Sequence, residues 1–179
     1  MYPKFSKYTY QNAELIKHLD PLVREVFFEF MLRLAMRGIY VRFTSGTRTE
    51  KEQDYLYSKG RSRPGRIVTN ADDHNSYHTW GYAIDIAVLW RIGPITFKAL
   101  WAPHLYQEIG YLARELGLQQ PIAGDLPHIQ YSGGVSIKGL KAGKTPPKPE
   151  FIPWDRPVVV DRVVERLTSK GIIPYNFPQ

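Results

Sequence analysis

The residue types best suited to chemistry in this sequence are two histidines and an aspartate. They occur in two short motifs, Ser76-x-His78-x-x-Gly81-x-Ala83-x-Asp85 and, farther along, Asp125-x-Pro127-His128. The two imidazoles of His78 and His128 with the carboxylate of Asp85 form a ligand set suited to Zn²⁺. Three protein ligands leave a fourth position for water, which is typical of a catalytic zinc site.

Asp125 is the natural general base beside such a metal. A metal ion lowers the pKa of its water to ~7, and a carboxylate within hydrogen-bond reach can accept the proton. In a regular strand, residues three apart point to opposite faces, which would separate Asp125 from His128. We therefore expect residues 124–127 to form a turn that leads into a strand.

The spacing of His78 and Asp85 is also compatible with a purely structural interpretation. A histidine on a strand is more often a hydrogen-bonded core or surface residue than a metal ligand, so a short motif carries a risk of false matches. In favour of a site, Gly81 permits a sharp turn between the two residues. Small side chains at Ala83 and Ala87 would also leave space beside Asp85.

The elements that must position these residues are visible as sequence patterns. Asp20 before Pro21 predicts a capped helix, whose apolar residues recur at helical spacing until Gly38. Residues 39–45 alternate between apolar and polar and predict a strand. The remaining predictions are helices over 50–59, opened by a Thr49-x-x-Glu52 capping box, and 103–116, and strands over 82–88 and 127–131.

In the strand over 82–88, Ile84, Ile86 and Val88 share one face, and Asp85 lies on the other between two alanines. The mixture of elements predicts an α+β fold.

The composition changes after the last predicted strand. We expect a catalytic domain over residues 1–135, a Lys/Pro/Gly-rich linker over 136–150 and a helical extension over 151–179. The extension has an apolar stripe that includes Val159 and Val163, and its length is too short to form a core alone. It is therefore expected to pack on the main domain.

The chain has 179 residues, a formal net charge of +7 and no cysteine. The charge indicates anionic partners such as nucleic acid, a membrane surface or cell wall. The lack of cysteine excludes disulfides, thiolate metal sites and cysteine nucleophiles. No apolar signal-peptide region opens the sequence and no stretch is long enough to span a bilayer, so synthesis in the cytoplasm without a signal peptide is expected.

Taken together, the motifs resemble zinc peptidases that include D-alanyl-D-alanine carboxypeptidases and phage L-alanyl-D-glutamate endopeptidases, relatives of the hedgehog fold. The resemblance implies a small antiparallel sheet that carries the zinc site, with helices packed on one side. The resemblance covers roughly residues 5–131 and several motifs in the same order. Besides the two motifs above, they are Phe5-Ser6-Lys7, Pro21-Leu22-Val23, Ser45-Gly46-Thr47-Arg48-Thr49 with Gln53, and Leu116-Gly117-Leu118.

The resemblance implies a role for each motif residue. His78, Asp85 and His128 would bind one Zn²⁺, and Asp125 would be the catalytic base. Arg48 would stabilise the oxyanion, which suits a fixed guanidinium near developing negative charge. Ser76 and Gln53 would position the substrate, with simple turn or cap roles as their alternative.

The implied function is an endolysin-type L-alanyl-D-glutamate endopeptidase that uses a zinc-bound water on peptidoglycan stem peptides. It would act as a monomer after release from the cytoplasm, through a holin if the source is a phage. The alternatives are a D-alanyl-D-alanine carboxypeptidase and a non-catalytic module that binds anionic polymers or nucleic acid. The binding-module alternative rests on the net charge and on Arg61, Arg63 and Arg66. No nucleic-acid-binding motif is present, so nucleic acid is not expected as a partner. The loop between Leu118 and Asp125 is shorter than in many relatives, which leaves the bond that is cleaved open.

Overall fold

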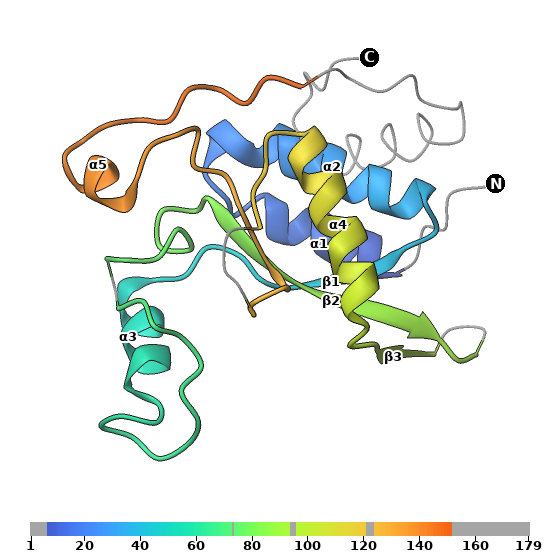
Figure 1. The fold of residues 1–179 in the computed structure, drawn as a ribbon, viewed down its shortest axis with the longest axis horizontal. Coiled ribbons are helices and arrows are strands. Elements are labelled where there is room, and N and C mark those ends of the chain that lie inside the picture. The colour runs from blue at the N-terminus through green and yellow to red at the C-terminus, as the bar shows by residue number, and fades with distance from the viewer. Residues whose placement is uncertain (1–6, 73, 94–95, 121–123, 152–179) are drawn as a thin grey trace.

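The computed structural model describes residues 7–72, 74–93, 96–120 and 124–151. It confirms an α+β fold with a small antiparallel sheet (Figure 1). In chain order the elements are α1 Lys7–Ile16, the 3₁₀ turn η1 Pro21–Val23, α2 Arg24–Met36, β1 Tyr40–Ser45, α3 Glu50–Ser58, β2 Ala83–Arg91, β3 Phe97–Ala99, α4 Pro103–Glu115, β4 His128–Gln130 and α5 Ile137–Lys141.

Strand β2 is the centre of the sheet. It pairs with β1 along one edge, while β4 and β3 share the other edge at opposite ends of β2. The register places Asp85 of β2 directly opposite His128 of β4. Residues opposite each other in adjacent strands have neighbouring side chains on one face, so this pairing brings two of the predicted ligands together.

Helices α1, α2 and α4 cover one face of the sheet (Figure 1). On that face Ile84, Ile86 and Val88 are buried, as the alternation in the sequence predicts. They join the aromatic side chains of α2, among them Phe27 and Phe30, in one apolar core. Helix α3 lies outside this layer, at the end of the sheet where Asp85 is found.

The predicted helix ends are confirmed in their local chemistry. The side chain of Asp20 accepts a hydrogen bond from the backbone N–H of Leu22, but the first turn is 3₁₀ before the α-helix begins. Thr49 and Glu52 form the expected capping box of α3. Helix α1 and strand β3 were not expected. Strand β3 has only three residues, too few for an alternating pattern.

Residues 136–150, expected as a linker, contact the rest of the domain. The segment contains α5, in which Leu140 is 3% exposed. The hydroxyl of Tyr131 donates a hydrogen bond of 2.8 Å to the carbonyl of Pro147. The helix expected over residues 155–170 lies outside the described residues, so the division into domain, linker and extension stays a prediction. Within the described part of the chain, no helix is long and apolar enough to cross a membrane.

Gly81 is required by a close approach between two chain segments. Its φ is +72°, and a Cβ built on it would lie 2.7 Å from the backbone nitrogen of Asp20. That nitrogen donates to the carbonyl of Gly81 at 3.1 Å. This hydrogen bond joins the segment before α2 to the turn that carries His78. The left-handed conformation and the lack of space both exclude a side chain here.

Replacing Gly81 by alanine is therefore expected to destabilise the protein by roughly 2–4 kcal/mol, since a backbone clash adds to the cost of a left-handed residue. Gly117 is the matched control, because its φ is +71° and a Cβ added there would meet no atom within 4 Å. Gly117→Ala should cost only about 1–2 kcal/mol. Urea denaturation measures both values, and equal losses would contradict the role of the close approach.

Candidate metal centre

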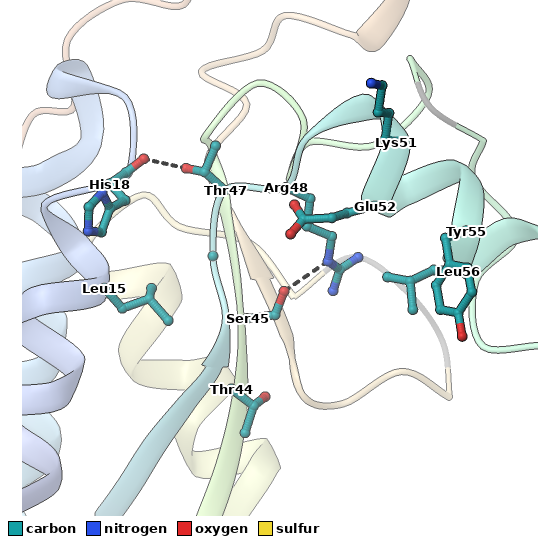
Figure 2. A pocket seen from close by; sticks show the side chains of 11 residues that line it. Leu15, His18, Thr44, Ser45, Thr47, Arg48, Lys51, Glu52, Tyr55 and Leu56 are labelled. Carbon is teal, nitrogen blue, oxygen red and sulfur yellow. Dashed lines mark hydrogen bonds between the residues drawn. The ribbon is translucent and has the colours of Figure 1, made fainter.

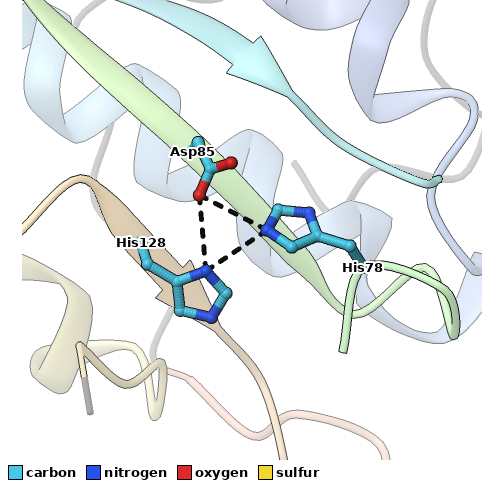
Figure 3. A group of neighbouring side chains, drawn as sticks. All are labelled: His78, Asp85 and His128. Carbon is cyan, nitrogen blue, oxygen red and sulfur yellow. Dashed lines mark hydrogen bonds and ion pairs between the residues drawn. The ribbon is translucent and has the colours of Figure 1, made fainter. Parts of the chain in front are cut away.

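Three ligand atoms from separate segments form a nearly equilateral triangle (Figure 3). Nε2 of His78 lies 3.2 Å from Nδ1 of His128, and both nitrogens lie 3.3 Å from Oδ1 of Asp85. His78 comes from the turn before β2, Asp85 from β2 and His128 from β4. The structure thus brings together all three residues that were predicted as ligands.

The triangle fits a tetrahedral zinc ion. Ligand atoms at the usual distances of 2.0–2.1 Å from such an ion lie about 3.4 Å from one another. The three edges of 3.2–3.3 Å agree with that separation. Two imidazoles and one carboxylate are also ligands that zinc prefers, and they leave one position for water or substrate.

The outer nitrogen of each imidazole has a hydrogen-bond partner that selects the tautomer. Nδ1 of His78 lies 2.8 Å from the carbonyl oxygen of Gly46, and Nε2 of His128 lies 3.0 Å from Oε1 of Gln130. Since these oxygens only accept, both outer nitrogens carry the proton. The inner nitrogens of the neutral rings then direct lone pairs at the centre, as metal-binding histidines require.

The charges of the centre depend on burial and on these contacts. Burial lowers the pKa of His78 and favours its neutral form. Burial alone would raise the pKa of Asp85, but hydrogen bonds with His128 and His78 and the charge of Arg48 outweigh it and hold that pKa well below its usual range. Burial alone would lower the pKa of His128, but its hydrogen bonds with Asp85 and Gln130 and the charge of Asp85 outweigh burial and raise that pKa.

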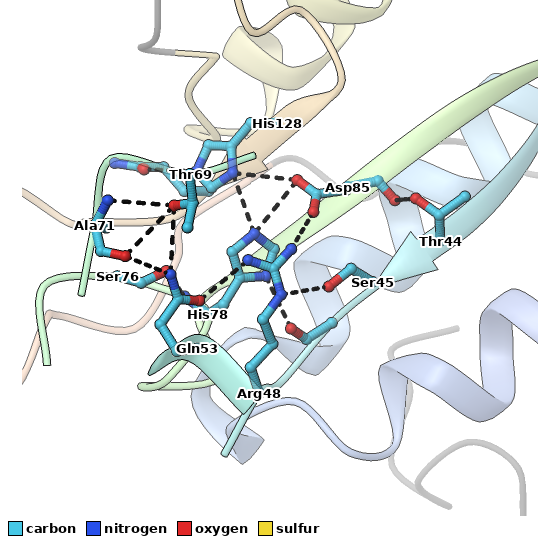
Figure 4. A network of polar contacts seen from close by, with 12 residues as sticks. Thr44, Ser45, Arg48, Gln53, Thr69, Ala71, Ser76, His78, Asp85 and His128 are labelled. Carbon is cyan, nitrogen blue, oxygen red and sulfur yellow. Dashed lines mark hydrogen bonds and ion pairs between the residues drawn. The ribbon is translucent and has the colours of Figure 1, made fainter. Parts of the chain in front are cut away.

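Arg48 forms an ion pair with the carboxylate of Asp85 (Figure 4). One terminal nitrogen pairs with Oδ2 of Asp85, the oxygen that does not face the imidazoles. Nε donates to Oγ of Ser45 at 2.9 Å, and the other terminal nitrogen donates to Oε1 of Gln53 at 3.2 Å. The guanidinium is therefore fixed at the rim of the centre by three partners on β1, α3 and β2.

Gln53, for which the sequence leaves substrate positioning and a simple turn or cap role open, is not among the residues that line the cleft. Its side chain is fully buried, accepts from Arg48 and donates to the carbonyl of Ala71 at 2.7 Å (Figure 4). Gln53 contacts Arg48 from outside the cleft, and its hydrogen bonds help to position the Arg48 guanidinium. Ser76 does line the cleft, and its Oγ accepts from the backbone N–H of His78 at 3.3 Å, which also supports the turn alternative.

Asp125 lies on the wall of the same cleft, separate from the ligand triangle. Its backbone carbonyl accepts from the N–H of His128 at 3.3 Å, and Gly124 before it has a φ of +86°. The expected turn is therefore present. Because the segment is a turn and not a strand, the rule that residues three apart point to opposite faces does not apply to Asp125 and His128.

The cleft around the centre has a volume of about 800 Å³. One wall is the loop over residues 67–71, and Ile137 of α5 contributes to the lining. Neither α5 nor Gln130 was identified from the sequence. Gln130 is two residues after His128 and so shares its strand face, a signal that was available.

A second cavity of about 640 Å³ lies between α1, the end of β1 and α3 (Figure 2). Its lining includes Leu15, Leu56 and Tyr55, together with Arg48. Arg48 lines both cavities, whereas none of the three candidate metal ligands lines the second one.

Residues 16–96, which include His78 and Asp85, match the family model described as VanY, D-alanyl-D-alanine carboxypeptidase. The peptidoglycan L-alanyl-D-glutamate endopeptidase CwlK of Bacillus subtilis (strain 168) is 40% identical over 85 residues, which are 48% of this chain and 51% of that protein. The chain therefore spans about half the length of this curated relative.

Among solved structures, the L-Ala D-Glu endopeptidase ChiX of Serratia marcescens aligns with a TM-score of 0.46 and 20% sequence identity. The alignment covers 71% of this chain and 88% of that chain. The resemblance to D-alanyl-D-alanine carboxypeptidases and L-alanyl-D-glutamate endopeptidases that the sequence predicts is confirmed by the family and sequence matches.

The contact between Gln130 and His128 predicts a change in metal affinity. Gln130→Met removes the acceptor for Nε2–H without a large change in volume, and zinc affinity should fall about 10–100-fold. Gln130→Glu keeps an acceptor and should bind zinc at least as tightly as Gln130→Met does. Competition with a chromogenic chelator measures both affinities.

Thermal unfolding of the metal-free variants provides the control, because a merely structural role of Gln130 would lower the midpoint without a separate loss of zinc. If Gln130→Met bound zinc as tightly as wild type, the Gln130 side chain would not orient His128.

Proposed function

We propose that this chain is a zinc-dependent peptidoglycan peptidase of the endolysin type, which hydrolyses the L-alanyl-D-glutamate bond of stem peptides. The main support is the ligand triangle of His78, Asp85 and His128 in a cleft that also contains Arg48 and Asp125. The 40% identity to a protein named as such an endopeptidase supports the choice of bond, over 85 residues.

A zinc ion in the centre would supply Lewis acidity, which polarises a carbonyl and makes water a nucleophile near neutral pH. Asp125 would take the proton of the attacking water and deliver it to the leaving amine. Its exposed position on the cleft wall is compatible with this transfer, since the carboxylate is not committed to the triangle.

Arg48 would stabilise the negative charge that develops on the carbonyl oxygen. A guanidinium has five N–H groups, and within the described residues three are used by Ser45, Gln53 and Asp85. Two remain for the substrate in the cleft. Because the three existing contacts fix the guanidinium, it would stabilise the oxyanion without reorganising, and such a donor is worth ~10²–10³ in rate.

The separate places of Asp125 and the triangle lead to a prediction. Asp125→Ala should retain zinc and the fold but lose activity ~10²–10⁴-fold, the usual contribution of a general base. Asp125→Glu should keep part of the rate, because the carboxylate is only displaced. His78→Ala removes a ligand and should lose both metal and activity.

Zinc stoichiometry and turnover are measured side by side for these three variants. A zinc-free Asp125→Ala would show that Asp125 is a ligand instead of a base. Full activity in that variant would place the proton acceptor on another residue.

The description of the matching family favours a D-alanyl-D-alanine carboxypeptidase as the second candidate. The two activities differ in their products on a defined stem peptide. The endopeptidase releases a fragment that begins with D-glutamate and leaves L-alanine as a new carboxyl end, whereas the carboxypeptidase releases free D-alanine. Mass spectrometry of the products distinguishes them, and a chelator that abolishes either product tests the need for metal. Activity that is indifferent to chelators would contradict the proposal.

A further inference from the structure

A basic lobe over residues 59–66 lies beside the cleft and has no part in the chemistry described above. It contains Lys59, Arg61, Arg63 and Arg66, and residues 55–71 contain no acidic residue. Residues 60–68 are all exposed. The chain that follows, residues 67–71, forms one wall of the cleft, so the lobe and the site are continuous.

The lobe has a defined conformation. Gly60 has a φ of +72°, and its N–H donates to the carbonyl of Arg63 at 2.9 Å. The guanidinium of Arg61 lies 4.0 Å from the ring centroid of Tyr57 and also donates to the backbone carbonyl of Thr69 at 3.1 Å. Arg61 thus connects the lobe to the cleft wall at Thr69.

Two of these cations lie against one aromatic ring. The ammonium of Lys59 is 4.8 Å and the guanidinium of Arg63 is 5.2 Å from the ring centroid of Tyr55. No ion pair among the described residues involves Lys59, Arg63 or Arg66. Like charges held together without a carboxylate repel each other, and such an arrangement is suited to an anion from outside.

We propose that Lys59, Arg63 and Arg66 bind free carboxylates of peptidoglycan stem peptides that neighbour the one in the cleft. The substrate class rests on the proposed function, in which the wall is a polymer rich in such carboxylates. Continuity with the cleft favours the substrate polymer as the source of the anion. Single-stranded nucleic acid is less suited, because the cations lie over the ring of Tyr55 that a base would stack on.

The double variant Lys59→Gln/Arg63→Gln tests this role. Its matched control is Lys98→Gln/Arg114→Gln, which removes one lysine and one arginine from β3 and α4, and Arg114 also lies over a tyrosine ring. The substrates are a soluble stem peptide and sacculi freed of phosphate-bearing polymers. On sacculi at low salt the lobe variant should be about tenfold slower than wild type, and the deficit should shrink at high salt.

On the soluble peptide the lobe variant should remain within about twofold of wild type, and the control variant should do so on both substrates. Equal rates of the two double variants on sacculi would overturn the proposal. A similar loss on the soluble peptide would also overturn it, because the lobe would then act on the cleft itself.

Sedimentation with sacculi separates this proposal from the proposed function, since it needs no cleavage. Wild type should sediment with sacculi that lack phosphate polymers, and amidation of the wall carboxylates should abolish this, as should the lobe substitutions. Sedimentation that requires the phosphate polymers, or that survives amidation, would overturn the role of carboxylates. If wild type sediments as expected but cleaves neither substrate, the proposed function fails and the binding surface stands.

Discussion

The two oxygens of Asp85 face different partners, and the candidate site depends on this division. Oδ1 lies 3.3 Å from both inner imidazole nitrogens, and Oδ2 pairs with Arg48. A largely buried carboxylate without partners would be costly, so both contacts are needed to keep it ionised. The sheet supplies them, because β4 sets His128 opposite Asp85 while β1 ends next to Arg48. The paired residues Ile84 and Ile129, next to Asp85 and His128, are buried in the apolar core.

Local signals in the sequence were sufficient for most of the elements and for the three candidate ligands that the structure brings together. The capping box at Thr49, the alternation around Asp85 and the glycine at 81 each report a short-range constraint. Local signals could not predict the burial of Gln53, since burial of a polar side chain depends on hydrogen-bond partners elsewhere in the chain. Its amide accepts from Arg48 and donates to the carbonyl of Ala71, which lies 18 positions after Gln53 in the chain.

The segment after β4 shows what composition reports and what it does not. Lysine, proline and glycine predict a linker over residues 136–150, and within it Leu140 is buried and the carbonyl of Pro147 accepts a hydrogen bond from Tyr131. Tyr77, one residue before His78, also donates to the carbonyl of Val135 at 2.8 Å. Gly133, Gly134 and Gly143 adopt positive φ at the turns of this segment, and two tyrosine hydroxyls hydrogen-bond to its backbone. The segment thereby becomes part of the cleft through Ile137.

Arginine at position 48 has properties that lysine lacks. Its planar fork contacts Ser45, Gln53 and Asp85 in three directions and still has N–H groups directed elsewhere. A lysine presents its donors from a single atom and cannot contact all three partners with the same geometry. Under the proposed function, the guanidinium that pairs with Asp85 would also stabilise charge on a substrate. Because Gln53 holds both Arg48 and the cleft wall at Ala71, the cation and the wall are positioned together.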